Sequence, residues 1–400
     1  MALGNLCLLA LLGVTLRSKI LFPMQLIDFT YILHAHSNFA FAGWITLALA
    51  ALMIYDILPA DAHNKKTYMW LLWTIEVNAL AIVIAFVIQG YAFFSIFFST
   101  VFVVVTYLFS YLFARDLLRS EAEKAVKILC LSALTCLVLS SVGPLILAYL
   151  VAAHSVNNLL YRDSVYTYLH LQYNGFFALA VFALFINGIY KTLNGDQLKK
   201  AGRFAATVSL SIFPTLFISY LWHYPDTWIM VLSIIGCVFI LLSIYYLITF
   251  LGSIKNDLKT IPRFTRNMSL LALIAFQLKS LLQMGTIIPS LGRMVYGDRA
   301  IIIGFLHLVL LGFISLYLLS HFLNSGALNV YSKFTKTAIV IFTSAVVANE
   351  VILMVQGFGN LLMLSNSIYT WLLWGVSIWL FTGALSIFAS RLVTRVRQNN

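Results

Sequence analysis

Three histidines with similar surroundings recur at near-equal intervals along this 400-residue chain. His36 lies in LHAHSNFAFAG, His170 in YLHLQYNGF and His307 in FLHLVLLGF, 134 and 137 residues apart. Neutral imidazole ligates haem iron and copper, so these positions are candidates for a cofactor site. A single histidine inside a helix bundle serves as often to hydrogen-bond a neighbouring helix. The recurrence is what favours a shared cofactor.

A second series of polar residues follows the same step. Gln89 in VIQGY, His223 in YLWHY and Gln356 in VQGFG stand 134 and 133 residues apart. Two series with one period predict a threefold internal repeat, with units near residues 1–130, 131–265 and 266–400. We expect the three units to form a single domain.

The composition indicates how these residues are positioned. With 62% hydrophobic and only 10% charged residues, the chain has too little polar surface for a water-soluble globule and is expected to be an integral membrane protein. Apolar runs long enough to cross ~30 Å of hydrocarbon can be placed twelve times. The predicted spans are 4–22, 30–57, 67–91, 93–114, 128–152, 165–190, 204–223, 227–252, 267–288, 299–320, 336–356 and 368–390. Each repeat therefore contains four helices, and the fold class is all-α.

The net charge of +12 reflects topology. If both termini are cytoplasmic, the cytoplasmic loops and the carboxyl tail hold 19 of the 25 Lys and Arg residues, and the opposite loops hold five. The positive-inside rule favours this orientation. We found no aromatic-interleaved basic patch, so no nucleic-acid partner is expected. The prediction is a multi-pass protein of a bacterial inner membrane, with both termini in the cytoplasm.

This topology gives the histidines a common depth. His34, His36, His170 and His307 fall in the outer halves of their spans, and His223 ends the seventh. Polar residues inside a membrane are costly and suggest function. We therefore expect at least one pair of these histidines to ligate a haem. Glu76, Lys279 and Glu350 also lie inside spans, and we expect them to pair or hydrogen-bond within the bundle rather than to form proton relays.

The order and depth of these motifs resemble the catalytic subunit, or subunit I, of the haem–copper oxidase and nitric oxide reductase superfamily. That family has twelve helices in three arcs of four, and its tenth helix carries HxH. The first histidine of that motif binds the high-spin haem and the second binds the low-spin haem. Here His307 matches the second and Phe305 replaces the first. On helix 2, HSN at His36 is similar to the HxN of nitric oxide reductases. His34 is the alternative ligand, since it lies about 200° round the helix from His36.

The copper side of the family pattern is incomplete. His170 resembles the copper ligand of helix 6, and Asn174 stands where nitric oxide reductases have a glutamate. The adjacent histidine pair at the end of helix 7 is Trp222-His223 here. Two imidazoles are a weak copper site. We favour the alternative that His170 is hydrogen-bonded in the bundle, and we expect substoichiometric copper.

These matches describe a degenerate member of the superfamily. We expect one low-spin b-type haem held by two histidines, for electron transfer beside a respiratory chain or for sensing a gas, without a standard binuclear centre. A six-coordinate haem leaves no open iron position for a substrate, so we favour a role without catalysis. One alternative is a divergent oxygen or nitric oxide reductase, and another is a cofactor-free transporter or assembly factor. Expected partners are the lipid bilayer and a respiratory or electron-donor subunit.

Overall fold

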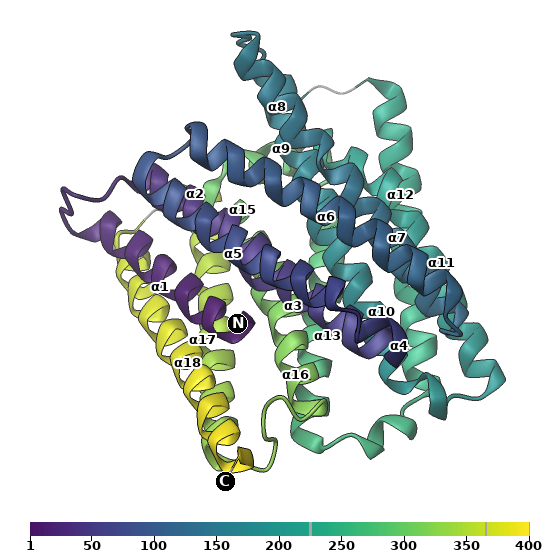
Figure 1. The fold of residues 1–400 in the computed structure, drawn as a ribbon. Coiled ribbons are helices and arrows are strands. Elements are labelled where there is room, and N and C mark those ends of the chain that lie inside the picture. Colours follow the sequence, from purple (N-terminus) through teal and green to yellow (C-terminus); the bar gives the residue numbers. More distant parts are fainter. Residues whose placement is uncertain (224–225, 365, 400) are drawn as a thin grey trace.

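The computed structural model of the chain is a bundle of long apolar helices (Figure 1). It describes residues 1–223, 226–364 and 366–399, with side chains described as far as Val393. Within these residues twelve helical spans are long and apolar enough to cross a membrane, and there is no strand. The chain is thus an all-helical, multi-pass membrane protein.

The first third of the chain provides four spans. Their elements are α1 (Ala2–Leu21); α2 (Phe29–Phe39), η1 (Ala40–Thr46), α3 (Leu47–Leu52) and η2 (Met53–Ile57) in one continuous span; the short α4 (Ala60–His63); α5 (Lys66–Gln89); and α6 (Phe93–Arg119).

The second third has the same order of spans. Its elements are α7 (Lys124–Ser140) with α8 (Val142–Ala152); α9 (Asn158–His170), η3 (Leu171–Phe177), α10 (Ala178–Ile189) and η4 (Tyr190–Thr192); α11 (Gly195–Leu216) with η5 (Phe217–Tyr220); and α12 (Thr227–Ser253).

The last third completes the bundle. Its elements are η6 (Asp257–Thr260); α13 (Arg263–Gly285); α14 (Pro289–Gly297); α15 (Arg299–His307), η7 (Leu308–Ser315) and α16 (Leu316–Asn324); α17 (Lys333–Leu361); and α18 (Ile368–Asn399).

The twelve predicted spans are confirmed in number and order, and several helices begin earlier than predicted. The sixth span begins at Asn158 rather than 165, and the seventh at Gly195 rather than 204. Both starts are set by polar caps. The Asn157 side chain accepts from the Leu160 amide, and Asn194 forms a capping box with Gln197. Such caps satisfy the free amides of a first turn, so the helix extends beyond its apolar run.

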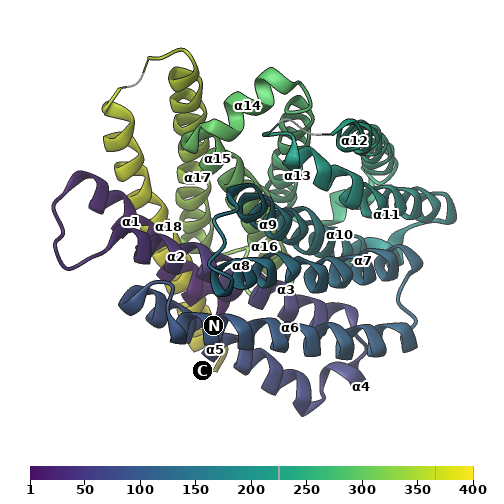
Figure 2. The same cartoon turned by 90° about the horizontal axis from the view of Figure 1, so that it is seen from above.

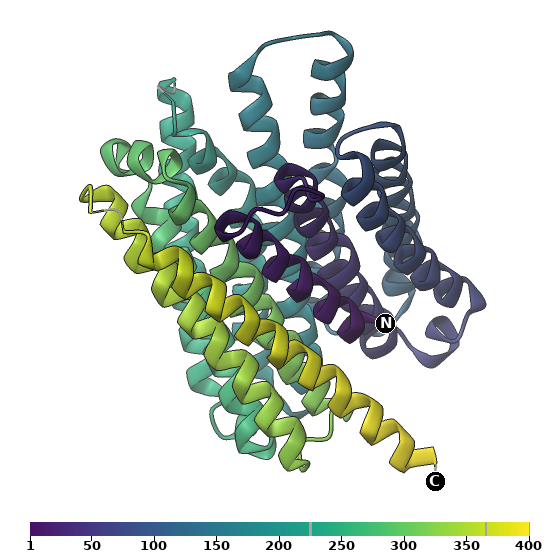
Figure 3. The same ribbon diagram turned by 90° about the vertical axis from the view of Figure 1, so that its left-hand side faces the viewer.

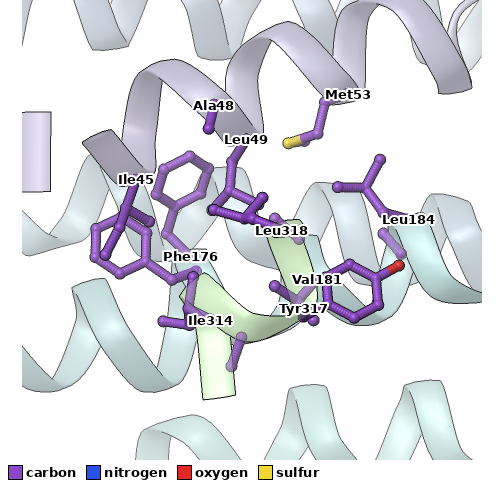
Figure 4. Close-up of a cluster of buried hydrophobic side chains, with 14 of the residues drawn as sticks. Ile45, Ala48, Leu49, Met53, Phe176, Val181, Leu184, Ile314, Tyr317 and Leu318 are labelled. Atoms are coloured by element: carbon purple, nitrogen blue, oxygen red, sulfur yellow. The ribbon is translucent and has the colours of Figure 1, made fainter. Parts of the chain in front are cut away.

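Three spans meet in the centre of the bundle (Figure 2), although the tenth does so only through η7 and α16, because α15 has no buried residue. The inner spans are Phe29–Ile57, Asn158–Thr192 and Arg299–Asn324, which are the second, sixth and tenth. Their side chains meet in one apolar cluster (Figure 4), where Leu49, Val181 and Leu318 are fully buried. The inner spans therefore form the rigid support for any site built on them.

A π-helical segment follows the histidine in each inner span. Segment η1 begins four residues after His36, η3 directly after His170 and η7 directly after His307. π-Helices are rare, and they occur frequently at functional sites. The wider turn frees backbone carbonyls, and Asn5 of α1 donates to one of them, Gly43 O, at 2.7 Å. The histidine stretches thus share a local backbone geometry as well as a sequence.

The surface of the bundle is apolar where lipid would contact it. Val77, Ile84 and Ile248 are each about 60% exposed (62%, 59% and 60%) on α5 and α12. Helices α1 and α18 pack side by side, so that the two ends of the chain are adjacent in the bundle (Figure 3). We call the end of the bundle opposite the carboxyl terminus the distal end. It carries the loops at residues 22–28, 153–157 and 286–298.

The ionisable residues inside the spans are hydrogen-bonded within the bundle, as expected. Asn5 donates to Glu76 at 2.6 Å, and Asn349 donates to Glu350 at 3.1 Å. Lys279 donates to Asn174 and, at 3.3 Å, to Gln283. Uncompensated, such groups would cost ~2.5–3.5 kcal/mol each at the centre of a membrane helix.

Candidate haem site

His36 lies near the distal end of the second span, in α2. Asp28 caps this helix by accepting from the amides of Thr30 and Tyr31 at 2.8 and 3.0 Å. The His36 ring packs against α1, where a Cβ built on Gly13 would lie 3.5 Å from His36 Cε1. Its Nδ1 atom is buried, has no hydrogen-bond partner and would lie 3.9 Å from the same Cβ, and the ring also hydrogen-bonds the backbone of Leu9 in α1. Buried polar atoms are rarely left without a partner, so this ring is a candidate ligand.

His307 ends α15 in the tenth span. Its Nδ1 donates to the carbonyl of Ile303, one turn earlier, at 2.8 Å. An imidazole that donates from Nδ1 presents the lone pair of Nε2, which is the form that binds a metal. No hydrogen bond to Nε2 is found in the described part of the chain. The helix itself therefore orients this ring as a ligand.

These two histidines, 271 residues apart in sequence, lie close enough in the bundle to interact electrostatically. Each would repel the other if both were protonated, and both interact electrostatically with Arg17 of α1. Neither ring faces a carboxylate in the described ion pairs. Two neutral imidazoles from different spans are the donor set of a six-coordinate haem, so these residues fit that group.

His34 has a different environment from His36. Its ring lies 4.5 Å from the ring of Tyr91 and 6.0 Å from that of Phe86, towards α5. Burial raises the pKa of Tyr91, which therefore stays a protonated phenol at neutral pH. Of the two candidates on helix 2, His36 interacts electrostatically with His307, whereas His34 packs against Tyr91 and Phe86.

His170 is held in a buried network. Its Nε2 donates to the carbonyl of Ile212 in α11 at 2.9 Å, and its Nδ1 accepts from Asn174 Nδ2 at 3.1 Å. Lys279 of α13 donates to the other end of the Asn174 amide. Both ring nitrogens are thus engaged, and a metal would have to displace one of these bonds.

His223 lies in the loop after η5, beyond the end of the seventh span. Its Nε2 is 3.5 Å from Oδ2 of Asp163, whose Oδ1 accepts from Trp222 at 2.8 Å. Asp163 precedes His170 by seven residues, which is about 10 Å along α9. No cluster of three or more His, Cys, Asp or Glu residues that could hold a metal occurs in the described chain. His170 is therefore hydrogen-bonded within the bundle, whereas the buried Nε2 of His223 faces Asp163 without a hydrogen bond.

A large cavity lies beside the tenth span, between α13 and α17. It has a volume of about 540 Å³ and is lined mostly by apolar side chains, with Tyr173, Phe305 and Glu350 among them. In the sequence comparison with haem–copper oxidases, Phe305 stands where that family has the histidine that binds the high-spin haem. The described lining contains no histidine and no cysteine. At its distal end Tyr296 donates to Ile218 O at 3.3 Å, and burial raises the pKa of Tyr296 to about 12.

Comparison with known proteins does not assign the chain to a family. No family model matches its sequence, and no curated protein matches it. The geometry of the histidines thus carries the functional argument.

Proposed function

We propose that this protein binds one low-spin b-type haem between His36 and His307, on a scaffold of the haem–copper oxidase subunit I type. The observation that carries the proposal is the meeting of these two histidines from distant spans, with His36 Nδ1 unpartnered and His307 oriented by Ile303. Further support comes from the π-helical segments η1, η3 and η7, one of which follows the histidine in each inner span, and which fit a threefold repeat of four helices.

The proposed role is electron transfer beside a respiratory chain, or sensing of a gas. A haem with two imidazole ligands supplies one-electron redox chemistry. The chain's own contribution is to hold the two rings at fixed positions on inner spans and to keep them away from water. Reduction of oxygen or nitric oxide would need an open iron position next to a second metal. The apolar cavity beside Phe305 offers no imidazole or thiolate for one, so electron transfer is the function we favour.

An optical spectrum of the purified protein tests the proposal. We expect the sharp bands of a six-coordinate b-type haem in the difference between the dithionite-reduced and oxidised forms. Consumption of oxygen or nitric oxide by the purified protein would favour a divergent reductase. A colourless protein would favour a cofactor-free transporter or assembly factor on the same scaffold.

The proposed location is a bacterial inner membrane, with both termini in the cytoplasm. The 19-to-5 distribution of basic residues supports this orientation, and it places the distal end, with the histidine pair, outside. Reporter fusions after Lys66 and Arg203 should then report cytoplasm, and one after Arg162 the opposite side. If the carboxyl terminus were external, the proposed haem would lie near the cytoplasmic side of the membrane rather than near the outer side.

A further inference from the structure

The cavity beside the tenth span lies where α13 and α17 diverge. Far from the distal end these helices are in contact, with Thr343 Oγ1 of α17 3.7 Å from Met268 Sδ of α13. Towards the distal end the cavity separates them, and α14, which lies between them in Figure 2, lines it with Leu291 and Tyr296. Its volume of about 540 Å³ is within the range of about 300–1,000 Å³ that is typical of small-molecule sites.

The mouth of this cavity faces the membrane. Ile274 of α13 and Met354 of α17 line the cavity and are nevertheless 62% and 52% exposed. Side chains that line a cavity and remain half exposed lie at its opening. Both helices are long and apolar enough to cross a membrane, and both residues lie well inside them. A ligand would therefore enter between the two helices from the hydrocarbon of the bilayer.

Polar side chains with unpaired atoms line this otherwise apolar space. Tyr173 is 8% exposed, and its hydroxyl has no hydrogen bond to any residue that the structure describes. Gln283 is 7% exposed, and its oxygen accepts from Lys279 at 3.3 Å, but its Nε2 has no acceptor among those residues. Glu350 accepts from Asn349 through Oε1 alone. Because buried polar groups are rarely left without a partner, these atoms are candidates for holding a ligand.

The donors and the acceptor come from different walls of the cavity. Lys279 donates to Gln283 and to Asn174, the residue that follows Tyr173, so the Tyr173 hydroxyl and the Gln283 amide belong to one wall. Glu350 belongs to α17, on the other side. A carbonyl oxygen accepts from a hydroxyl and an amide, and a hydroxyl group donates to a carboxyl oxygen. The two walls therefore match a molecule that carries both a carbonyl and a hydroxyl group.

The same groups disfavour a charged ligand. An ammonium group has no acceptor to offer the Gln283 amide or the Tyr173 hydroxyl. A carboxylate or phosphate would be brought towards the carboxyl group of Glu350. Either ion would also lose its hydration in a space lined mostly by apolar side chains. The chemistry of the cavity thus selects an uncharged head on an apolar body.

We propose that this cavity binds an uncharged lipid whose head carries an ester carbonyl and a free hydroxyl group, as in a monoacylglycerol. Tyr173 and Gln283 donate to the carbonyl, the head hydroxyl donates to Glu350, and the apolar walls hold the acyl chain. The site is separate from the proposed haem site, because neither His36 nor His307 lines the cavity.

A monoacylglycerol with a photoreactive diazirine in its acyl chain tests this inference. The full-length protein in detergent is irradiated with the probe, and the labelled residues are identified by mass spectrometry. We expect labels on the cavity-lining residues of α13 and α17. Monooleoylglycerol should displace the probe about tenfold more effectively than methyl oleate, which keeps the ester carbonyl but has no hydroxyl group to donate to Glu350.

Substitutions of the polar groups separate their roles. Tyr173→Phe removes only the unpaired hydroxyl and should weaken both competitors by a similar factor, about threefold to tenfold, because both carry the carbonyl. Tyr245→Phe, on an exposed face of α12, is the matched control and should change neither. Glu350→Leu should instead abolish the preference for monooleoylglycerol over methyl oleate.

A variant that fills the cavity tests the location. Leu278→Trp places a large side chain in it from α13 and should abolish the labelling that monooleoylglycerol displaces, whereas Ile248→Trp, on a lipid-facing part of α12, should not. Equal displacement by the two competitors overturns the proposal. So does labelling of α13 and α17 that survives Leu278→Trp, since the probe would then mark only lipid around the bundle. A second haem that is lost in Leu278→Trp would show that the cavity holds a porphyrin instead.

Discussion

His170 and the His36–His307 pair stand at matching places in the inner spans, each shortly before a π-helical segment, yet their ring nitrogens have different partners. Both nitrogens of His170 are hydrogen-bonded, to Ile212 and Asn174. His36 has a buried nitrogen without a partner, and His307 bonds only through Nδ1.

The residue four positions later explains much of this difference. It is Asn174 after His170, but Ala40 after His36 and Leu311 after His307. An amide one turn along the helix reaches the imidazole, whereas an apolar side chain cannot bond it. His36 and His307 bond backbone groups of Leu9 and Ile303 instead. Lys279 then fixes Asn174 from α13. The histidine at this position is therefore structural in the sixth span and a candidate ligand in the second and tenth spans.

Replacing either proposed ligand is the most severe test of this comparison. His36→Ala or His307→Ala should abolish the low-spin spectrum, because each contributes one axial imidazole. His63→Ala, which alters a histidine in the short helix α4, should leave the spectrum intact. Absorption spectra of the purified variants decide the matter. If His34→Ala removes the spectrum and His36→Ala does not, the ligand on the second span is His34.

His170→Ala should instead reduce stability and spare the spectrum. The change removes the acceptor of Asn174 Nδ2 in the interior, and leaving a buried polar group unpaired costs ~1–3 kcal/mol, whereas the Ile212 carbonyl still accepts from Thr215 Oγ1. A lower thermal unfolding midpoint, measured in detergent, would report this loss. Complete loss of the low-spin haem from a folded His170→Ala variant would show that His170 is a ligand after all.

The copper content of the protein should not depend on His170 or His223. Their separate partners, together with the weak affinity of a site with two histidines, predict clearly less than one copper per chain. Elemental analysis of the wild type and of His170→Ala and His223→Ala measures it. One copper per chain, lost in both variants, would contradict this and revive the reductase alternative.

The sequence predicted the parts of the fold that depend on hydrophobicity. Twelve spans follow from the length of the apolar runs, and their order was predicted correctly. Helix starts were less predictable, because Asn157 and Asn194 extend helices into polar sequence by capping. His223 was expected to end a span, but the helix ends at Tyr220 and His223 lies in the following loop.

The candidate site depended on contacts that the sequence shows only in part. Spacing and resemblance selected His36 and His307, but could not choose between His34 and His36, since that choice depends on how α2 is rotated against α1. The hydrogen bond from Lys279 to Asn174 joins residues 105 positions apart and has no sequence signal.

The smallest expected effect concerns the contact between two inner spans. Trp44 Nε1 donates to Ser315 Oγ at 2.8 Å, joining η1 to η7 below the histidine pair. Such hydrogen bonds contribute only about 0.6 kcal/mol on average within membranes, so Ser315→Ala should lower the free energy of unfolding slightly. Ser344→Ala is the control, because Ser344 bonds only to carbonyls of its own helix, α17.

The Ser315→Ala spectrum should match that of the wild type, since the apolar cluster of Leu49, Val181 and Leu318 still holds the inner spans together. Unfolding in a mixture of detergents gives the difference in stability, and the reduced spectrum gives the state of the haem. Loss of the low-spin bands in Ser315→Ala but not in Ser344→Ala would mean that one hydrogen bond positions His307. The π-helical segments would then be part of the site rather than its support.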